Sequence, residues 1–286
     1  MTTSHPKSIL QTRGLVAKHH FGQNFLSDPS LCAKIAAAAA PDGTETTIEI
    51  GAGVGALTAQ LLERKCHVIA IERDRDLVPV LSELFDDSLR NGKLELVEAD
   101  AKTYDYESAL RGCRSPATLC GNLPYQLTGP LLRRAIELAP LLSRATFLVQ
   151  LEVADRLAAA PGSDAYGALS VFLQARYCPK RSFVIKRGAF YPQPNVDSAV
   201  VVLSPLPAAV IDETPLFRNL VKSAFAQRRK KLRNAWQAVV AGHKERLDEA
   251  AARVGIDLDL RGEVLSVQQF ANMAKDLESF DQGSLT

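Results

Sequence analysis

A glycine-rich turn between a strand pattern and a helix pattern constrains the fold of this chain more than any other feature. Residues 46–50 form a short β-branched run, and Gly51, Gly53 and Gly55 follow it. Apolar residues then recur with helical spacing in residues 56–63. A glycine turn in this position lets the backbone approach a ligand closely and points the N–H groups of the helix at it. The sequence therefore predicts a strand–turn–helix unit that binds a ligand at the turn.

Strand and helix patterns alternate through most of the chain. Strands are expected at residues 46–50, 67–72, 94–97, 117–121, 145–148, 183–185 and 198–203. Further helices are expected at residues 29–40, 74–84, 127–138 and 153–160, the first of them capped by Asp28 before Pro29. This alternation predicts a doubly wound, mostly parallel sheet, and the last two strands could form an antiparallel hairpin at its edge.

The character of the sequence changes after Leu203. Two prolines, Pro205 and Pro207, interrupt the strand pattern, and only helical periodicity remains from Pro215 onward. A chain of 286 residues is long enough for one α/β domain and a smaller appendage. We therefore expect an α/β domain over residues 1–205 and an all-α domain over residues 206–286.

The glycine turn is the candidate cofactor site, together with two acidic residues that follow strands. Glu72 follows Gly51 by 21 residues and stands at the end of the second expected strand. An acidic residue there can accept both hydroxyls of an adenosine ribose. Asp100, after the third strand, could meet the amino group of the adenine. NAD and S-adenosylmethionine both carry such a ribose, so Gly51, Gly53 and Glu72 do not separate these two cofactors.

A second motif, Asn122-Leu123-Pro124-Tyr125, follows the fourth expected strand. The carboxyl ends of parallel strands meet at one edge of a sheet, where open α/β folds bind ligands. The Asn122 side-chain oxygen and the Leu123 carbonyl can accept the two hydrogens of an amine, and Tyr125 can stack on a base. Phe190, in a loop held by prolines, could clamp such a base from its other face. Together with the glycine turn, this motif predicts methyl transfer to an amino nitrogen.

Basic residues cluster in two places, although the net charge of +2 alone indicates no nucleic-acid partner. A run without acidic residues is expected on a helix and comprises Arg228, Arg229, Lys230, Lys231 and Arg233. A second strip comprises Lys180, Arg181, Lys186 and Arg187. A solvated helix face is the commoner explanation for one such run, but two strips in a chain with a base-sized site favour nucleic acid.

Other site types are not expected. The five cysteines include no C-x-x-C pair and accompany no histidine cluster, so we expect no metal site and reduced thiols in a reducing compartment. The sequence has no apolar stretch of membrane-spanning length and no apolar core of a secretory signal. We therefore expect a cytoplasmic protein without a membrane partner.

Six motifs in order resemble the small-subunit rRNA adenine dimethyltransferases of the KsgA (RsmA) type. They are FGQNFL at 21–26, EIGAGVGALT at 49–58, GNLPY at 121–125, AYGALSV at 165–171, AFYPQPNVDSAVV at 189–201 and AFAQRRKKLRN at 224–234. The resemblance implies a Rossmann-like class I methyltransferase fold with a small helical C-terminal domain. The chain departs from the family pattern at Lys18-His19-His20, Gln126-Leu127-Thr128, Leu151 and Asn195, which bears on RNA docking and not on the catalytic turn.

The resemblance also implies an activity and a set of contacts. The activity is transfer of two methyl groups from S-adenosylmethionine to N6 of each of two adjacent adenosines near the 3′ end of 16S rRNA, in a late assembly intermediate of the small subunit. The residues implied to contact the cofactor are Asn24, Leu26, Gly51, Glu72, Asp100 and Asn122. Tyr125 and Phe190 are implied to sandwich the target adenine, and we expect a monomer.

Four other functions compete with this one. The large-subunit rRNA methyltransferases that confer macrolide resistance share the fold and a similar turn, but the motifs at 165–171 and 228–234 favour the small-subunit group. A DNA adenine methyltransferase would more often have proline at position 123, so no DNA substrate is expected. A non-catalytic assembly factor would not need intact Glu72 and Asn122. A nicotinamide dehydrogenase offers no reason for the motif at 122–125.

Overall fold

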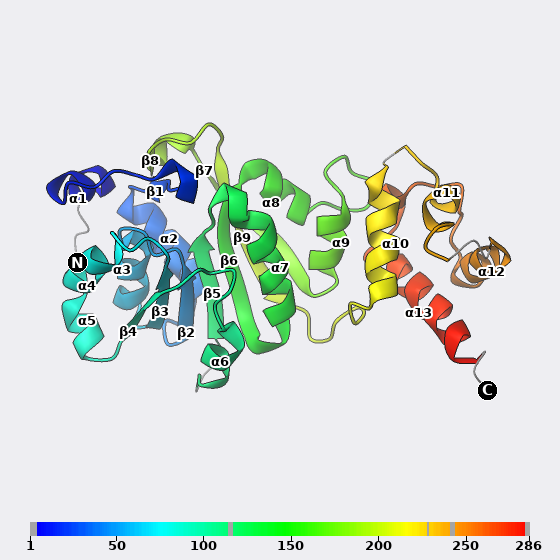
Figure 1. Cartoon of the computed structure of the whole chain (residues 1–286), viewed down its shortest axis with the longest axis horizontal. Helices are drawn as coiled ribbons and strands as arrows, with labels where there is room; N and C mark the ends of the chain where they lie inside the picture. Colours follow the sequence, from blue (N-terminus) through cyan, green and yellow to red (C-terminus); the bar gives the residue numbers. More distant parts are fainter. Residues whose placement is uncertain (1–4, 114–116, 228, 241–243, 284–286) are drawn as a thin grey trace. The chain divides into compact units, whose positions relative to one another are not determined.

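The structure is a computed structural model that describes residues 5–113, 117–227, 229–240 and 244–283 (Figure 1). The chain forms two compact units. The sheet unit comprises Met1–Ala154 and Cys178–Pro205, and the helical unit comprises Asp155–Tyr177 and Leu206–Thr286.

A seven-stranded sheet forms the centre of the sheet unit, with the strand order β4-β3-β2-β5-β6-β9-β7. Neighbours from β4 to β6 are parallel, and β9 runs antiparallel to β6. The strands are β2 (Thr46–Ile50), β3 (His67–Glu72), β4 (Leu94–Glu98), β5 (Ala117–Asn122), β6 (Leu142–Gln150), β7 (Tyr177–Ile185) and β9 (Ser198–Pro205). The predicted Rossmann-like, mostly parallel seven-stranded sheet is confirmed.

Helices flank this sheet and connect its parallel strands. They are α1 (Pro6–Thr12), α2 (Pro29–Ala39), α3 (Ala56–Glu63), α4 (Val78–Leu84), α5 (Asp86–Arg90), α6 (Tyr106–Arg111), α7 (Thr128–Leu138) and α8 (Leu151–Leu157), with the 3-10 turns η1 (His19–Phe21), η2 (Tyr125–Leu127), η3 (Ala139–Leu141) and η4 (Arg187–Ala189). The predicted cap of α2 is present, because the Asp28 carboxylate accepts the Ser30 N–H at 2.8 Å.

One helix begins later than the sequence pattern predicts. A helix was expected from Asp74, but α4 starts at Val78. The Asp74 carboxylate accepts the Asp76 backbone N–H at 3.1 Å and also binds Lys18 and Gln23. A side chain that hydrogen-bonds its own neighbouring backbone competes with helix formation, so residues 74–77 form a turn instead.

A small second sheet joins the N-terminal segment to a late loop. The strand β1 (Phe25–Leu26) pairs antiparallel with β8 (Phe190–Tyr191), and Leu26 lies opposite Phe190. Ser27 continues this contact, because its backbone N–H and its hydroxyl both donate to the Ala189 carbonyl, at 2.9 and 2.8 Å. These contacts fix where residues 18–24 run across the edge of the main sheet.

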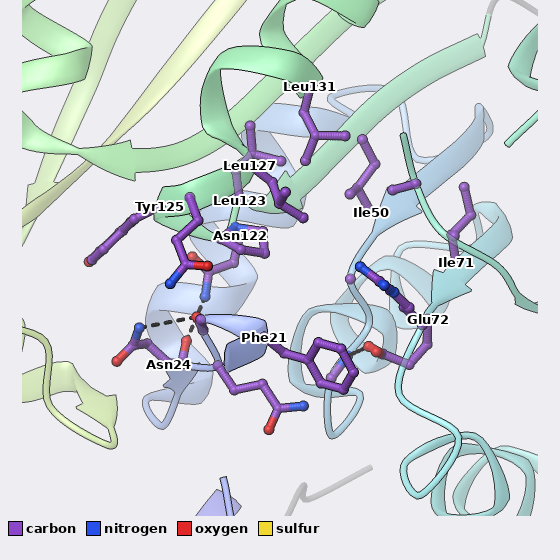
Figure 2. Close-up of a pocket in the computed structure, with 18 of the residues that line it drawn as sticks. Phe21, Asn24, Ile50, Ile71, Glu72, Asn122, Leu123, Tyr125, Leu127 and Leu131 are labelled. Atoms are coloured by element: carbon purple, nitrogen blue, oxygen red, sulfur yellow. Dashed lines mark hydrogen bonds between the residues drawn. The ribbon is translucent and has the colours of Figure 1, made fainter. Parts of the chain in front are cut away.

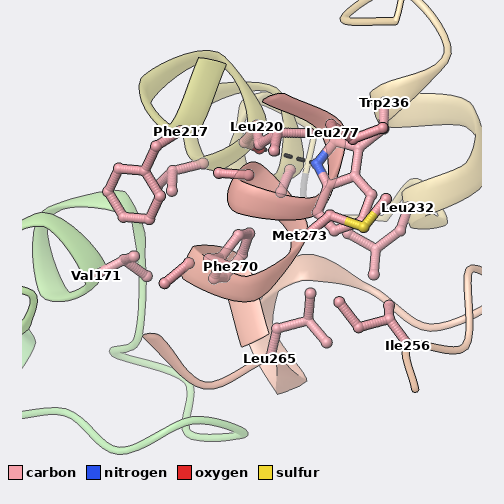
Figure 3. Packing of buried hydrophobic residues seen from close by; sticks show 14 of the residues in the cluster. Val171, Phe217, Leu220, Leu232, Trp236, Ile256, Leu265, Phe270, Met273 and Leu277 are labelled. Atoms are coloured by element: carbon pink, nitrogen blue, oxygen red, sulfur yellow. Dashed lines mark hydrogen bonds between the residues drawn. The ribbon is translucent and has the colours of Figure 1, made fainter. Parts of the chain in front are cut away.

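The helical unit has its own hydrophobic core (Figure 3). Its elements are α9 (Ala168–Gln174), α10 (Pro215–Ala226), α11 (Leu232–Trp236), α12 (Lys244–Val254), η5 (Gly262–Val264) and α13 (Val267–Gly283). Trp236 is fully buried and donates its indole N–H to the Leu220 carbonyl at 2.9 Å. Among the described residues, no helix has the length and apolar character needed to cross a bilayer.

The limits of the helical unit differ from the predicted domain boundary. The predicted domain boundary after residue 205 coincides with one point at which the chain passes from the sheet unit to the helical unit. However, Asp155–Tyr177 also belongs to the helical unit. Its apolar side chains explain this, since Tyr166 and Val171 belong to the same buried cluster as Phe217 and Phe270. Local periodicity cannot reveal which core a helix joins.

The basic run near residue 230 does not lie on a continuous helix, which corrects the sequence-based expectation. The helix α10 ends at Ala226, and α11 begins only at Leu232. The backbone N–H groups of Leu232 and Arg233 donate to the carbonyls of Leu260 and Leu258, at 2.8 and 2.9 Å. Helical spacing would also bring like charges together at i, i+4, which is unfavourable. The tertiary contacts and the charge repulsion together explain the break.

Candidate active site

A pocket of about 240 Å³ lies at the carboxyl ends of β2, β3 and β5, where the sequence predicted a ligand site (Figure 2). The predicted residues that line it are Asn24, Gly51, Gly53, Glu72, Asp100, Asn122, Leu123 and Tyr125. These side chains and backbone groups come from the N-terminal segment and from the ends of four strands. The fold therefore brings most of the predicted site into one cavity.

The glycine loop after β2 adopts a conformation that side chains oppose. Gly51, Gly53 and Gly55 have φ angles of 73°, 59° and 81°, in the left-handed region. A Cβ atom on Gly53 would also lie 2.9 Å from the Phe25 ring. The loop is anchored to β3, because the Gly51 N–H donates to the Ile71 carbonyl at 2.8 Å. The glycines thus keep the backbone close to the pocket wall.

Glu72 lies at the end of β3, is only 7% exposed and faces the glycine loop. One carboxylate oxygen accepts the Gly53 N–H at 2.7 Å, and the other accepts the Asp74 N–H at 2.8 Å. Burial raises the pKa of Glu72, and these backbone hydrogen bonds counteract part of that effect. Each oxygen has further acceptor capacity, so the carboxylate suits a pair of neighbouring hydroxyl groups.

An aromatic ring and an ion pair border the pocket beside Glu72. The Arg73 guanidinium lies 5.4 Å from the centre of the Phe21 ring and forms an ion pair with Asp100 at 3.2 Å. The Lys18 ammonium lies 5.6 Å from the same ring centre. Asp100 is therefore a pocket residue, as predicted, but its carboxylate already has a cationic partner.

The orientation of the Asn122 amide follows from its hydrogen bond. Its Nδ2 donates to the backbone carbonyl of Asn24 at 2.7 Å. A carbonyl can only accept a hydrogen bond, so the nitrogen must face Asn24 and Oδ1 must point elsewhere. Figure 2 shows this bond and shows Asn122 beside Leu123 and Leu127. Asn122 thus presents an acceptor that is already aligned before any ligand arrives.

The residues after Asn122 are held by the neighbouring strands. Leu123 is buried and donates its N–H to the Leu148 carbonyl at 3.1 Å. The Tyr125 hydroxyl lies 3.1 Å from the Ser198 hydroxyl, and its ring is half-buried. Burial raises the pKa of Tyr125 and the bond to Ser198 partly opposes this, so the phenol stays protonated at neutral pH.

A more open cavity lies beyond Tyr125 and shares part of its lining with the pocket. The residues common to both are Gly22, Gln23, Asn24, Tyr125 and Gln126. Its outer wall is formed by residues 192–196, in the loop between β8 and β9. Tyr125 therefore lines both cavities.

Two predicted residues lie away from the pocket. Phe190 is 5% exposed and packs into the core with Leu26 and Ile185, because β8 pairs with β1. Phe190 lines neither this pocket nor the cavity beside Tyr125 that is described above, and its sandwich with Tyr125 stays a prediction. Leu26 lines a smaller cavity of about 50 Å³ on the other side of the glycine loop.

The basic residues predicted to bind RNA are not equivalent. Arg228 lies outside the described residues. Lys231 forms an ion pair with Asp259 at 3.1 Å, and Arg233 pairs with Asp248. Arg229 and Lys230 are exposed, and no ion pair is found for either within the described part of the chain. These two cations are therefore the ones most available to phosphate.

Sequence reasoning missed Phe21, Gln23 and Arg73 as pocket residues. All three stand beside residues that were chosen, in the motif 21–26 or directly after Glu72. The charged stretch Glu72-Arg73-Asp74 behind a buried strand was the available signal, because charges at a strand end face the ligand edge of the sheet.

Comparison with known proteins identifies the family. The family model described as ribosomal RNA adenine dimethylase matches residues 14–279. The chain belongs to this family. The prediction of an rRNA adenine dimethyltransferase of the KsgA type is therefore confirmed, and the dehydrogenase alternative is excluded.

Curated relatives cover almost the whole chain. The protein named ribosomal RNA small subunit methyltransferase A from Anaeromyxobacter sp. (strain K) is 42% identical over 95% of this chain and 97% of its own length. The protein of the same name from Streptococcus pneumoniae (strain P1031) is 36% identical over 95% of this chain and 96% of its own.

Two solved structures share the fold. A dimethyladenosine transferase from Plasmodium falciparum matches with a TM-score of 0.71 and 24% identity, over 91% of this chain and 98% of that one. The 23S rRNA methyltransferase ErmE matches with a TM-score of 0.67 and 23% identity, over 89% and 100%. At these identities the two matches support the fold alone.

Proposed function

We propose that this family member transfers methyl groups from S-adenosylmethionine to N6 of adenosines in the 16S rRNA of the small subunit. The observation that carries the proposal is the orientation of Asn122, whose Nδ2 is occupied by Asn24 and whose Oδ1 is left to accept. Asn122 lines the same pocket as Glu72 and the glycine loop. A pocket with these two features suits the transfer of a methyl group from a nucleoside cofactor to an amine.

The residues present fit the cofactor. Glu72 would accept the two ribose hydroxyls while it keeps its bonds to the N–H groups of Gly53 and Asp74. The positive φ angles at Gly51 and Gly53 leave room for close approach of the cofactor. Asp100 would meet the adenine amino group, and Asn24 also lines the pocket. When bound, S-adenosylmethionine supplies an electrophilic methyl group on a positively charged sulfur.

The turn after β5 would prepare the amine. Asn122 Oδ1 and the Leu123 carbonyl accept its two hydrogens and draw electron density toward the nitrogen, which otherwise delocalises its lone pair into the ring. Preorganised acceptors of this kind supply most of the rate effect without a strong base. The exposed face of Tyr125 stacks on the base, and Phe190 would need to leave the core contact of β8 to reach its other face.

Finer aspects of the substrate rest on the resemblance. We propose that the enzyme dimethylates two adjacent adenosines near the 3′ end of 16S rRNA, on a late assembly intermediate. It would act as a cytoplasmic monomer, with an α/β catalytic domain and a helical domain that comprises Asp155–Tyr177 and Leu206–Thr286. The exposed Arg229 and Lys230, with Arg228, Lys231 and Arg233 beside them in sequence, would contact phosphates.

A methyl-transfer assay tests the activity. Small subunits that lack the modification, large subunits and duplex DNA are each incubated with labelled S-adenosylmethionine and the enzyme. We expect N6,N6-dimethyladenosine by mass spectrometry in the small-subunit rRNA only. Label in large-subunit rRNA or in DNA would redirect the proposal to the rival substrate, and cofactor binding without dimethyladenosine in any sample would refute it.

A salt titration tests the RNA contact. The double variant Arg229→Gln/Lys230→Gln should bind small subunits more weakly, and the slope of log K against log salt should fall by about 1–2. The matched control is Lys65→Gln/Lys93→Gln, which removes two exposed lysines. Lys65 lies two residues before β3 and Lys93 lies one residue before β4, at the amino ends of these strands and away from the pocket at their carboxyl ends. An unchanged slope in the first variant would show that Arg229 and Lys230 are ordinary solvated surface residues that do not contact phosphates.

A further inference from the structure

The carboxylate of Asp74 joins the N-terminal segment to the end of β3. Asp74 is 2% exposed, and both of its oxygens are bonded. Oδ1 accepts the Lys18 ammonium at 2.5 Å, and Oδ2 accepts the Gln23 side-chain amide at 2.7 Å. Gln23 Oε1 in turn accepts the backbone N–H of Lys18 at 2.7 Å. These bonds close residues 18–23 into a loop that is fastened to one buried carboxylate, which we call the Asp74 clamp.

The Asp74 clamp lies between the two parts of the pocket. On one side, the Asp74 N–H donates to Glu72, and Glu72 also accepts the Gly53 N–H. On the other side, Gln23 immediately precedes Asn24, whose carbonyl receives Nδ2 of Asn122. Hydrogen bonds, joined by the covalent chain within Asp74 and between Gln23 and Asn24, therefore link the glycine loop to the amide of Asn122.

We propose that Asp74 is a positioning residue, which sets the orientation of the Asn122 amide by holding the Asn24 carbonyl in place through Gln23 and Lys18. The inference rests on the proposed function, because it specifies how the acceptor for the target amine is prepared. Rotation about the last torsion of an asparagine side chain is soft and roughly two-fold. Without a fixed carbonyl at Asn24, the amide of Asn122 can rotate, and its N–H groups would then face the amine hydrogens.

The charges of the clamp support this role. Burial alone would raise the pKa of the Asp74 carboxyl, but the bonds from Lys18 and Gln23 outweigh it, and the pKa lies below its ordinary value. The carboxylate thus remains ionised at neutral pH and keeps both donors. Lys18 also pairs with Asp76 at 2.6 Å, but the Asp76 side chain is 54% exposed and makes no bond to Gln23. Asp76 is therefore the matched control for the loss of one negative charge beside Lys18.

The first experiment separates positioning from binding. In Asp74→Asn the shape is kept, but one oxygen becomes an NH2 group that cannot accept from Lys18 or Gln23. We expect kcat to fall by about 10- to 100-fold, with the dissociation constant of S-adenosylmethionine changed less than about threefold, since the backbone N–H to Glu72 remains. Gln23→Leu, which leaves the Lys18–Asp74 ion pair intact, should show the same split, and Asp76→Asn should retain wild-type kcat.

A double-mutant cycle tests whether Asp74 acts through Asn122. In the background of Asn122→Ala, the change Asp74→Asn should reduce kcat by less than about twofold, because there is no longer an amide to orient. If Asp74→Asn costs the same factor with and without Asn122, the inference is overturned. If the wild-type enzyme forms no dimethyladenosine, the proposed function fails, and the inference is then judged by the following measurement.

The second measurement does not depend on turnover. In ¹⁵N-labelled protein, the side-chain NH2 signal of Asn122, assigned by its disappearance in Asn122→Ala, reports the bond to Asn24. We expect its hydrogen exchange to be roughly tenfold faster in Asp74→Asn and in Gln23→Leu than in wild type, and unchanged in Asp76→Asn. Equal exchange rates in wild type, Asp74→Asn and Gln23→Leu would show that Asp74 does not hold the amide.

Discussion

On the glycine-loop side of the pocket, formed by Gly51–Gly55 and Glu72, the ligand-facing groups are held by backbone hydrogen bonds to neighbouring residues. On the turn side, formed by Asn122–Tyr125, a backbone group holds Asn122 and Leu123, and Tyr125 is held only through its hydroxyl, by Ser198. Phe190 lies in the core. On the proposed assignment, the contrast teaches that this fold aligns the groups for the cofactor and the amine in advance, whereas contact of Phe190 with a base would require a rearrangement.

The largest effect is expected at the prepared part of the turn side. Asn122→Ala removes an acceptor that the protein aligns in advance, so kcat should fall by about 10²–10³-fold. The affinity for S-adenosylmethionine should remain measurable by calorimetry, because Glu72 and the glycine loop are untouched. Turnover equal to that of the wild type would mean that other residues activate the amine, and that the turn side does not hold a prepared acceptor.

Glu49, beneath the glycine loop, offers a test of how far water is excluded from the interior on the glycine-loop side. It is fully buried, and burial raises its pKa to about 7, while the Thr58 hydroxyl at 2.6 Å opposes the shift and the charge of Glu72 adds to it. The folded protein binds this proton more tightly than the unfolded chain, so its contribution to stability is present at low pH and is lost as the pH rises to about 7.

Glu49→Gln, which is neutral at every pH, should lose this dependence. The amount by which its free energy of unfolding exceeds that of wild type should be about 2–3 kcal/mol larger at pH 8 than at pH 5, measured by urea denaturation at both values. Glu95→Gln, at an exposed position on β4, is the control and should show no such difference. A flat difference for Glu49→Gln would mean that water reaches the underside of the loop.

Glu72→Gln tests the prepared contacts of the glycine-loop side. The change replaces a charged acceptor by one that also carries N–H groups, which would face the N–H of Gly53 or Asp74. The dissociation constant of S-adenosylmethionine should rise by roughly 10- to 100-fold, as expected for hydrogen bonds to a charged group. Isothermal titration calorimetry measures this, and an unchanged constant would remove Glu72 from the cofactor site.

The smallest effects are expected at Tyr125, on the turn side. Tyr125→Ala removes a stacking face and should raise KM for the RNA substrate by about tenfold. Tyr125→Phe keeps the ring and loses only the contact with Ser198, so KM should change by less than about twofold. If both variants behave alike, the hydroxyl and not the ring matters, and the role of Tyr125 is structural.

Features that depend on local sequence were predictable. The strand β2 occupies the expected residues 46–50, and Glu72 and Asn122 are the last residues of β3 and β5. In a parallel sheet the carboxyl ends of all strands meet at one edge, so finding the strand ends was enough to place both residues in one pocket.

Features that depend on distant partners were not predictable in this way. Gln23 and Asp74 bond across 51 residues of sequence, and no local pattern reveals this contact. Phe190 is buried because β8 pairs with β1, a contact between two segments of only two residues each. Such short strands carry no periodic signal, so the sequence motif placed Phe190 near the site without revealing its packing.

The bond between Asn122 and the Asn24 carbonyl has a consequence for the choice of base. With its donor engaged inside the protein, Asn122 offers an incoming base only lone pairs. On the proposed assignment, a purine such as hypoxanthine would place its keto oxygen against Oδ1 of Asn122. Both oxygens can only accept hydrogen bonds, so no hydrogen bond would form between them. Deaminated adenosine should therefore be excluded already at the docking step, before the methyl donor is involved.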